Sequence, residues 1–224
     1  ELERVYELLA DDHSRKVLRD VVEYKLTGDI KLLRGCESEP REAWESILRP
    51  GKEEHYMDLG AYTGDTIAEF IGYAGEWRRI TALEPDPVTF AKLERNTAGL
   101  HDCILYRLGA YSRYARLPFA GGAGRGSHLA AGGAMTELDS VDNILCGQTV
   151  SLINMDVEGM EAEAIAGMAK TLRRHRPKLL IAGYHRSEDL WRLPLEVLAI
   201  QPEYKVYVRH YPCLPAWDVN FYFL

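Results

Sequence analysis

The stretch YMDLGAYTGDT, Tyr56 to Thr66, decides the fold of this chain. An acid, Asp58, is followed by two glycines four positions apart, Gly60 and Gly64. Gly60 lets the chain turn sharply and Gly64 lets a ligand approach the backbone closely, because glycine adopts conformations that other residues avoid. A helix that starts near Thr66 would present free backbone N–H groups there. The stretch predicts a strand, a tight turn and a helix, either as a ligand site or as a turn alone.

Short β-rich runs alternate with helical runs from His55 onward, which is typical of a parallel sheet covered by helices on both faces. We expect strands at 55–59, 79–83, 104–108, 150–155, 178–182, 205–210 and 219–224. No helix separates the last two, so they should form an antiparallel pair. The predicted fold class is α/β: a doubly wound, mostly parallel, Rossmann-like seven-stranded sheet with an antiparallel last strand and a helical N-terminal extension.

The segments between these strands carry their own signals. Helices are expected from Thr66 to about Gly72, after Asp86 as N-cap, after the fourth strand, and over 188–200. Residues 119–135 are rich in glycine and alanine, which predicts a mobile loop. Apolar residues recur at helical spacing in the first 48 residues, with a break at TGD, Thr27 to Asp29. We therefore predict a helical extension over 1–50, which could pair with a second subunit in a homo-oligomer, and a main domain over 51–224.

Composition restricts the partners. The chain has 224 residues, with 27 basic against 34 acidic ones, and its net charge of −7 repels phosphate backbones and anionic membranes. We expect no nucleic acid and no membrane as partners. Four dispersed cysteines without a CxxC pair favour reduced thiols in a cytoplasmic protein over a zinc site or a disulfide framework.

A second acid supports a ligand site. Glu84 ends the second expected strand, 20 residues after Gly64, at about the distance where doubly wound folds place the carboxylate that binds a ribose. The alternative is a solvated loop acid. Tyr62 stands where a dinucleotide motif would place its middle glycine, and Asp58 would repel a pyrophosphate. An acid-lined pocket suits the sulfonium, ammonium and ribose of S-adenosylmethionine instead.

Acids after the fourth strand are candidates for catalysis. Methyl transfer requires alignment of the acceptor oxygen with the methyl group and removal of a proton from an alcohol. Asp156 or His185 is the preferred base, and Glu158 would orient the base or the substrate. Asp156 could instead only contact cofactor, Glu158 could cap the next helix, and His185 could be a surface residue. Asp139, Asp156 and Glu158 could supply oxygen ligands to a divalent ion, but no spacing requires one, and we predict no metal site.

Five motifs occur in order along the chain: YMDLGAYTGDT, ALEPDPVTFAKLERN, LDS at Leu138 to Ser140, INMDVEGMEAEAIAGM from Ile153 to Met168, and HRSEDLW from His185. Together they resemble the FkbM-type family of class I S-adenosylmethionine-dependent methyltransferases. One departure is Asn154, which stands where a lysine is common in that family.

The resemblance implies S-adenosylmethionine as cofactor and O-methylation of a small hydroxylated metabolite or sugar. It also implies, by position, a set of cofactor-binding residues: Asp58, Gly60, Ala61, Gly64, Asp65, Thr66, Glu84, Pro85, Asp86, Gly109, Ala110, Asp139 and Asp156. Residues after the first strand would line the methionine end, and Glu84 would bind the ribose. The alternatives to this function are a nicotinamide-dependent Rossmann oxidoreductase and a non-catalytic module that binds a nucleoside cofactor.

Overall fold

The computed structural model describes residues 1–120, 128–129, 133–212 and 218–224. By internal contacts the chain divides into two compact units: Glu1–Arg49 with Lys178–Leu224, and Pro50–Pro177. Compactness alone does not show that a segment folds independently, so the division into an extension over 1–50 and a domain over 51–224 stays a prediction.

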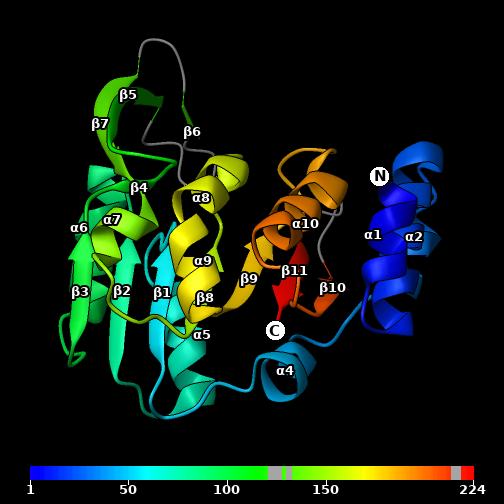
Figure 1. The fold of residues 1–224 in the computed structure, drawn as a ribbon, viewed down its shortest axis with the longest axis horizontal. Coiled ribbons are helices and arrows are strands. Elements are labelled where there is room, and N and C mark those ends of the chain that lie inside the picture. Colours follow the sequence, from blue (N-terminus) through cyan, green and yellow to red (C-terminus); the bar gives the residue numbers. More distant parts are fainter. Residues whose placement is uncertain (121–127, 130–132, 213–217) are drawn as a thin grey trace. The chain divides into compact units, whose positions relative to one another are not determined.

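The larger sheet has seven strands in the order β10-β11-β9-β8-β1-β2-β3 (Figure 1). This order confirms the predicted doubly wound α/β class. The unit Pro50–Pro177 contributes four strands, which pair in parallel: β1 (His55–Leu59), β2 (Arg79–Leu83), β3 (Cys103–Tyr106) and β8 (Leu152–Met155). All five residues of β1 are buried, as expected for a parallel strand with layers on both faces.

Helices cover both faces of these four strands. Figure 1 shows α5 (Asp65–Ala74) and α6 (Pro87–Thr97) on one face, and α8 (Glu161–Gly167) and α9 (Ala169–His175) on the other. Helices on both faces of parallel strands are typical of α/β folds. Asp86 caps α6 as predicted, since its carboxylate accepts hydrogen bonds from the N–H groups of Val88 (3.0 Å) and Thr89 (2.8 Å).

A second sheet, which the sequence did not predict, follows β3. Its strand order is β4-β7-β5-β6, with bounds β4 (Gly109–Ala110), β5 (Ala115–Ala120), β6 (His128–Leu129) and β7 (Ala134–Asp139). The loop predicted over 119–135 is therefore wrong where these strands are described, and 121–127 and 130–132 lie outside the described residues. Backbone pairing does not require large side chains, so a glycine- and alanine-rich composition does not exclude a ladder. The short helix α7 (Val141–Leu145) follows β7.

The other unit contains the end of the chain and its beginning. Its strands are β9 (Lys178–Ala182), β10 (Val206–His210) and β11 (Val219–Phe223), and α10 (Asp189–Ile200) follows β9. β11 is antiparallel to both β9 and β10, which confirms the predicted antiparallel pair. The N-terminal segment is helical as expected: α1 (Leu2–Leu8), α2 (Asp12–Thr27), α3 (Ile30–Gly35), α4 (Pro40–Glu42) and the π-helix η1 (Ala43–Leu48).

The N-terminal segment runs along β10, the strand at one edge of the sheet. The N–H of Ala10 donates to the carbonyl of Val206 (2.8 Å), and the N–H of Ser38 donates to the carbonyl of His210 (2.7 Å). The Ser14 hydroxyl accepts from the N–H of Val208 at 3.1 Å. An uncovered edge strand can pair with other chains, so these bonds give the N-terminal helices a structural role.

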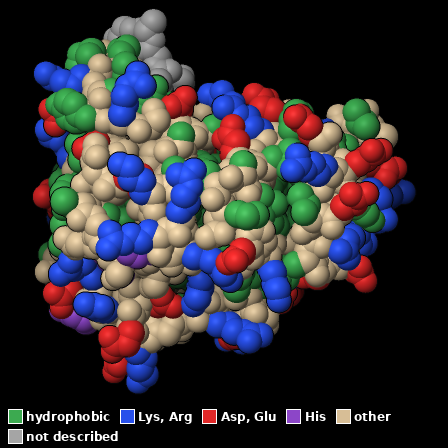
Figure 2. All heavy atoms as spheres, viewed as in Figure 1, with side chains coloured by type: hydrophobic (Ala, Val, Ile, Leu, Met, Phe, Trp, Pro, Cys, Tyr) green, Lys and Arg blue, Asp and Glu red, His purple; other side chains and the backbone are tan. Residues whose placement is uncertain are grey.

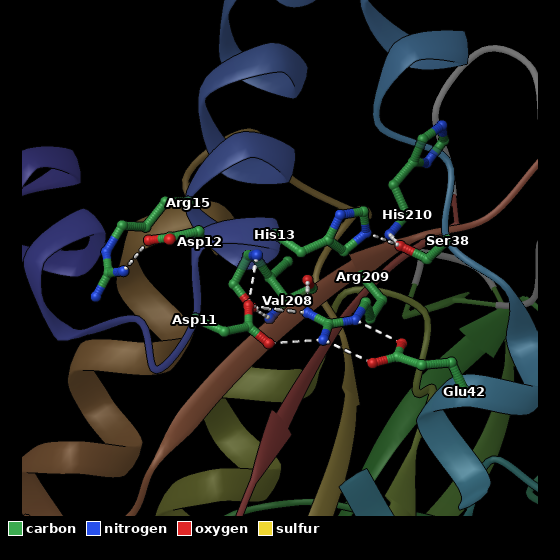
Figure 3. Close-up of polar contacts among 10 residues, drawn as sticks. Asp11, Asp12, His13, Arg15, Ser38, Glu42, Val208, Arg209 and His210 are labelled. Carbon is green, nitrogen blue, oxygen red and sulfur yellow. Dashed lines mark hydrogen bonds and ion pairs between the residues drawn. The ribbon is translucent and has the colours of Figure 1, made fainter. Parts of the chain in front are cut away.

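Arg209 of β10 joins this segment to the sheet (Figure 3). Arg209 is 2% exposed, and its guanidinium donates to both oxygens of Glu42, at 2.8 and 2.9 Å. It also donates to Asp11 (2.7 Å) and to the Ser14 hydroxyl (2.8 Å). Burial acts to raise the pKa of Asp11, but the hydrogen bonds from Arg209 and Ser14 outweigh it and hold the pKa at about 2. A buried guanidinium with these partners ties α2 and α4 to β10.

Opposite charges share the face of the molecule in Figure 2, where Lys and Arg side chains are interspersed with Asp and Glu. Within the described parts of the chain, no helix combines the length and apolar character that a membrane crossing needs.

Asp11 gives the first testable prediction. A carboxyl group with a lowered pKa stabilises the fold above its unfolded pKa of 3.8, and this contribution is lost as pH falls through the folded value near 2. We expect Asp11→Asn to lower the free energy of unfolding at pH 7, and the difference from wild type to shrink between pH 4 and pH 2. Urea unfolding at a series of pH values measures this.

The neighbouring Asp12 provides the matched control, because its side chain is fully exposed and, among the residues that the structure describes, pairs with Arg15 at the surface. Asp12→Asn should change the free energy of unfolding by less than about 0.5 kcal/mol. Equal effects of the two substitutions would contradict the role given to the Arg209 cluster.

Candidate active site at the carboxyl ends of β8, β1 and β2

The turn after β1 is held by backbone bonds to β2. The N–H groups of Gly60 and Ala61 both donate to the carbonyl of Leu83, at 3.0 and 2.9 Å. Gly60 has a φ of 85°, and a Cβ placed on it would lie 1.9 Å from the carbonyl oxygen of Asp156. No residue with a side chain fits this position. Because Gly60 has none, the ends of β1 and β8 can approach each other directly.

Glu84 lies at the end of β2, beside this turn. It is 7% exposed, and its carboxylate accepts from the N–H groups of Tyr62 (3.1 Å) and Asp86 (2.8 Å). Burial raises the pKa of Glu84 to about 7, although these two backbone hydrogen bonds act to lower it. A carboxylate can accept about four hydrogen bonds, so Glu84 retains capacity for further donors such as the hydroxyls of a ribose.

Asp58 lies inside the protein, and its predicted role in binding the cofactor stays a prediction. It is fully buried and accepts from Thr66 (2.5 Å), Asn154 (2.9 Å) and Tyr56 (3.3 Å). Burial raises the pKa of Asp58 to about 6, against the lowering effect of these bonds. The network links β1, β8 and the first turn of α5. Sequence reasoning missed Tyr56 and Asn154, because side-chain pairing across strands leaves no local motif.

A second strained turn follows β8. The N–H of Asp156 donates to the carbonyl of Leu59 at 3.0 Å, and Asp156 and Glu158 are half-buried. Glu158 and Gly159 have positive φ values of 53° and 88°. Glu161, 1% exposed, accepts from the N–H groups of Val157 and Gly159, both at 3.2 Å. Glu161 thus shapes the turn that carries Asp156. In the sequence, the one signal for this role is the place of Glu161 in the first turn of a helix.

Comparison with known proteins places these features in a family. Residues 58–207 match the family described as the methyltransferase FkbM domain. The chain belongs to this family. The resemblance seen in the five motifs is therefore confirmed.

Solved structures agree with this assignment. A crystal structure of methyltransferase FkbM from Methylobacillus flagellatus is 28% identical, with a TM-score of 0.87; the match covers 100% of this chain and 58% of that one. The chain therefore spans somewhat more than half the length of that FkbM protein. Among curated proteins the comparison found no match.

More distant matches show the fold alone. An Aeropyrum pernix fibrillarin with bound S-adenosyl-L-methionine has 14% identity, a TM-score of 0.55, and coverage of 82% of this chain and 71% of that one. A precorrin-6y C5,15-methyltransferase from Geobacter metallireducens has 14% identity, a TM-score of 0.53, and coverage of 82% and 84%.

Other residues predicted to bind cofactor in this FkbM domain have structural partners. Asp139 accepts from the N–H of Ser140 (2.7 Å) and the amide of Asn143 (2.9 Å) at the start of α7. Gly109 and Ala110 pair with Leu138 and Asp139 in the second sheet. Asp86 is the cap of α6 and is 3% exposed. Asp65 is exposed and Pro85 half-buried next to the two turns. Cofactor contacts at these positions stay predictions.

His185 belongs to the other compact unit, where it follows β9. Its ring is half-buried and packs against Tyr184 with ring centroids 4.3 Å apart. Its role as the base stays a prediction.

The contact between Gly60 and Asp156 gives a stability prediction for the FkbM domain. Gly60→Ala places a methyl group on a carbonyl oxygen at positive φ, so we expect the free energy of unfolding to fall by more than about 2 kcal/mol. The matched control is Gly72→Ala in α5, where a Cβ meets no atom within 4 Å. There we expect a gain of roughly 0.5–1 kcal/mol. Urea unfolding of both variants measures these changes, and a neutral Gly60→Ala would contradict the close approach.

Proposed function

We propose that this FkbM domain is an S-adenosylmethionine-dependent methyltransferase that methylates a hydroxyl oxygen of a small molecule. The observation that supports this best is the meeting of three strand ends in one unit, with Gly60 packed on Asp156 and Glu84 bonded to the turn. Ligands of open α/β sheets bind at this edge. Methyl transfer is the activity of the family. The cofactor, the acceptor and the activity of the whole protein belong to the proposal.

The residues present suit this cofactor. Gly60 and Gly64 bring backbone without side chains to the strand ends. The first turn of α5 would present N–H groups to the carboxylate of the cofactor's methionine end. Glu84 would accept the ribose hydroxyls. Asp156 is an acid at the strand ends, so it favours a ligand with a positive charge and disfavours the pyrophosphate of a nicotinamide dinucleotide. When bound, S-adenosylmethionine supplies an electrophilic methyl group.

The chain itself would orient the acceptor and take its proton. Asp156 follows β8 on a turn fixed by Glu161, so its carboxylate is held at the edge where the ligand is expected. As a base it would accept the hydroxyl proton while the oxygen attacks in line. Glu158, two residues on, would orient the acceptor. His185 is the alternative base.

Glu84 should make cofactor affinity depend on pH. Its ionised form accepts ribose hydroxyls, and its pKa is raised to about 7 by burial. We expect the dissociation constant of S-adenosylhomocysteine to increase by up to tenfold per pH unit below pH 7 and to level off above it. Isothermal titration between pH 5.5 and 8.5 measures this dependence.

Glu84→Gln should bind weakly and lose the pH dependence, because its amide does not titrate. If wild type binds NAD and not S-adenosylhomocysteine, the proposed cofactor is wrong.

Asp156 should separate catalysis from binding. We expect Asp156→Asn to lower transfer of radiolabelled methyl groups to a panel of hydroxylated acceptors by about 10²–10⁴-fold, with affinity for S-adenosylhomocysteine changed by less than threefold. Asp12→Asn, the same substitution on the exposed N-terminal helix, is the control and should retain full activity. A wild-type protein that binds the cofactor but methylates no acceptor would favour the non-catalytic module.

A further inference from the structure

A hollow of about 320 Å³ lies at the edge of the sheet opposite the proposed active site. It is lined by His55, Arg78, Arg79, Gln148 and Thr149. His55 and Arg79 are the first residues of β1 and β2, whereas Gly60 follows the last residue of β1. A strand rises ~3.3 Å per residue, so the two sites are separated by roughly the length of β1. The proposed methyl transfer gives this hollow no role.

Hydrogen-bond donors from arginine dominate the lining. The Nη1 group of Arg79 donates to the side-chain carbonyl of Gln148 at 2.7 Å. This bond fixes the guanidinium while its other N–H groups have no partner among the described residues. Arg78 is exposed, and within the described residues no carboxylate pairs with it. The hollow therefore combines one guanidinium bonded to Gln148 with a second, exposed one.

His55 lines the hollow, but both of its ring nitrogens are hydrogen-bonded within the protein and do not serve a bound anion. Nδ1–H donates to the carbonyl of Thr149 (2.5 Å), and Nε2 accepts from the Thr81 hydroxyl (2.8 Å). Burial lowers the pKa of His55, and the charges of Arg79 and Arg78 lower it further, against the bond to Thr149. The ring is thus neutral near pH 7, and both charged groups that act on it are cations.

No acid is among the five lining residues, in a chain whose net charge is −7. A local concentration of positive charge attracts anions even on a protein that is acidic overall. Arginine forks match the oxygens of phosphate in geometry as well as charge. Gln148 and Thr149 add an amide and a hydroxyl, which can donate to further oxygens.

We propose that the hollow at the amino ends of β1 and β2 binds a phosphate group through Arg79 and Arg78. Arg79 is the anchor, because Gln148 holds it in place, and Arg78 adds a second charge from the rim. The phosphate is either the free ion or the phosphoryl group of a larger molecule, and the volume of the hollow admits both.

Isothermal titration at constant ionic strength tests this binding, with sodium phosphate and glycerol 1-phosphate as probes and chloride as the balancing anion. We expect saturable 1:1 binding of at least one probe to wild type. Arg79→Gln should weaken it at least tenfold, and Arg79→Lys, which keeps the charge but loses the fork, should weaken it less. Arg173→Gln, the same change at an exposed arginine in the last turn of α9, should leave it within twofold.

Stronger binding of the ester supports a phosphoryl group of a larger ligand, and stronger binding of the ion supports free phosphate. No saturable binding of either probe to wild type, or unchanged binding to Arg79→Gln, overturns the proposal. Affinity for S-adenosylhomocysteine, measured on the same Arg79→Gln sample, should stay at the wild-type value. That measurement keeps failure of this site distinct from failure of the proposed methyltransferase, and urea unfolding of the same sample shows that the variant is folded.

Discussion

The close approach of Gly60 to Asp156 is the constraint on which the rest of the site depends. A glycine at the end of β1 lets the backbone of β8 come within the space that a side chain would fill. The same turn bonds to Leu83 at the end of β2. Three strand ends are therefore fixed by backbone contacts, and the side chains that follow them, Glu84 and Asp156, are placed by main-chain geometry rather than by flexible loops.

The carboxylate of Glu84 at this edge is held at a cost in stability. Burial raises the pKa of Glu84 from 4.5 to about 7, so its contribution to stability is lost as pH rises from 4.5 through 7. One pKa unit corresponds to 1.36 kcal/mol, so ionised Glu84 costs roughly 3 kcal/mol. A ligand that donates hydrogen bonds to Glu84 would offset part of this cost. Under the proposed function, the ribose hydroxyls of the cofactor would be such donors.

The N-terminal segment covers the edge strand of the sheet. The sheet ends at β10, and the helices before residue 49 cover that strand through backbone bonds and the buried Arg209. Buried ion pairs contribute little net stability relative to apolar packing, but breaking one is costly. Arg209 therefore fixes where the segment docks. A surface for a second subunit, expected from the sequence, stays a prediction. The same helices already contact β10 within the chain.

The sequence by itself determined the seven strands, the antiparallel end and the position of the turn at Gly60, because these follow from local periodicity, glycine placement and the Asp86 cap. Boundaries of β3, β8, β10 and β11 differed by one or two residues, since strand ends depend on pairing. The tertiary structure alone decided that Asp58 is buried among Tyr56, Thr66 and Asn154, and that Glu161 shapes the turn of Asp156. It also decided that strands near both ends of 119–135 belong to a second sheet, and that Arg79 lines a hollow. Each of these arises from contacts between residues distant in sequence, and such contacts depend on how strands pair rather than on any local pattern of side chains.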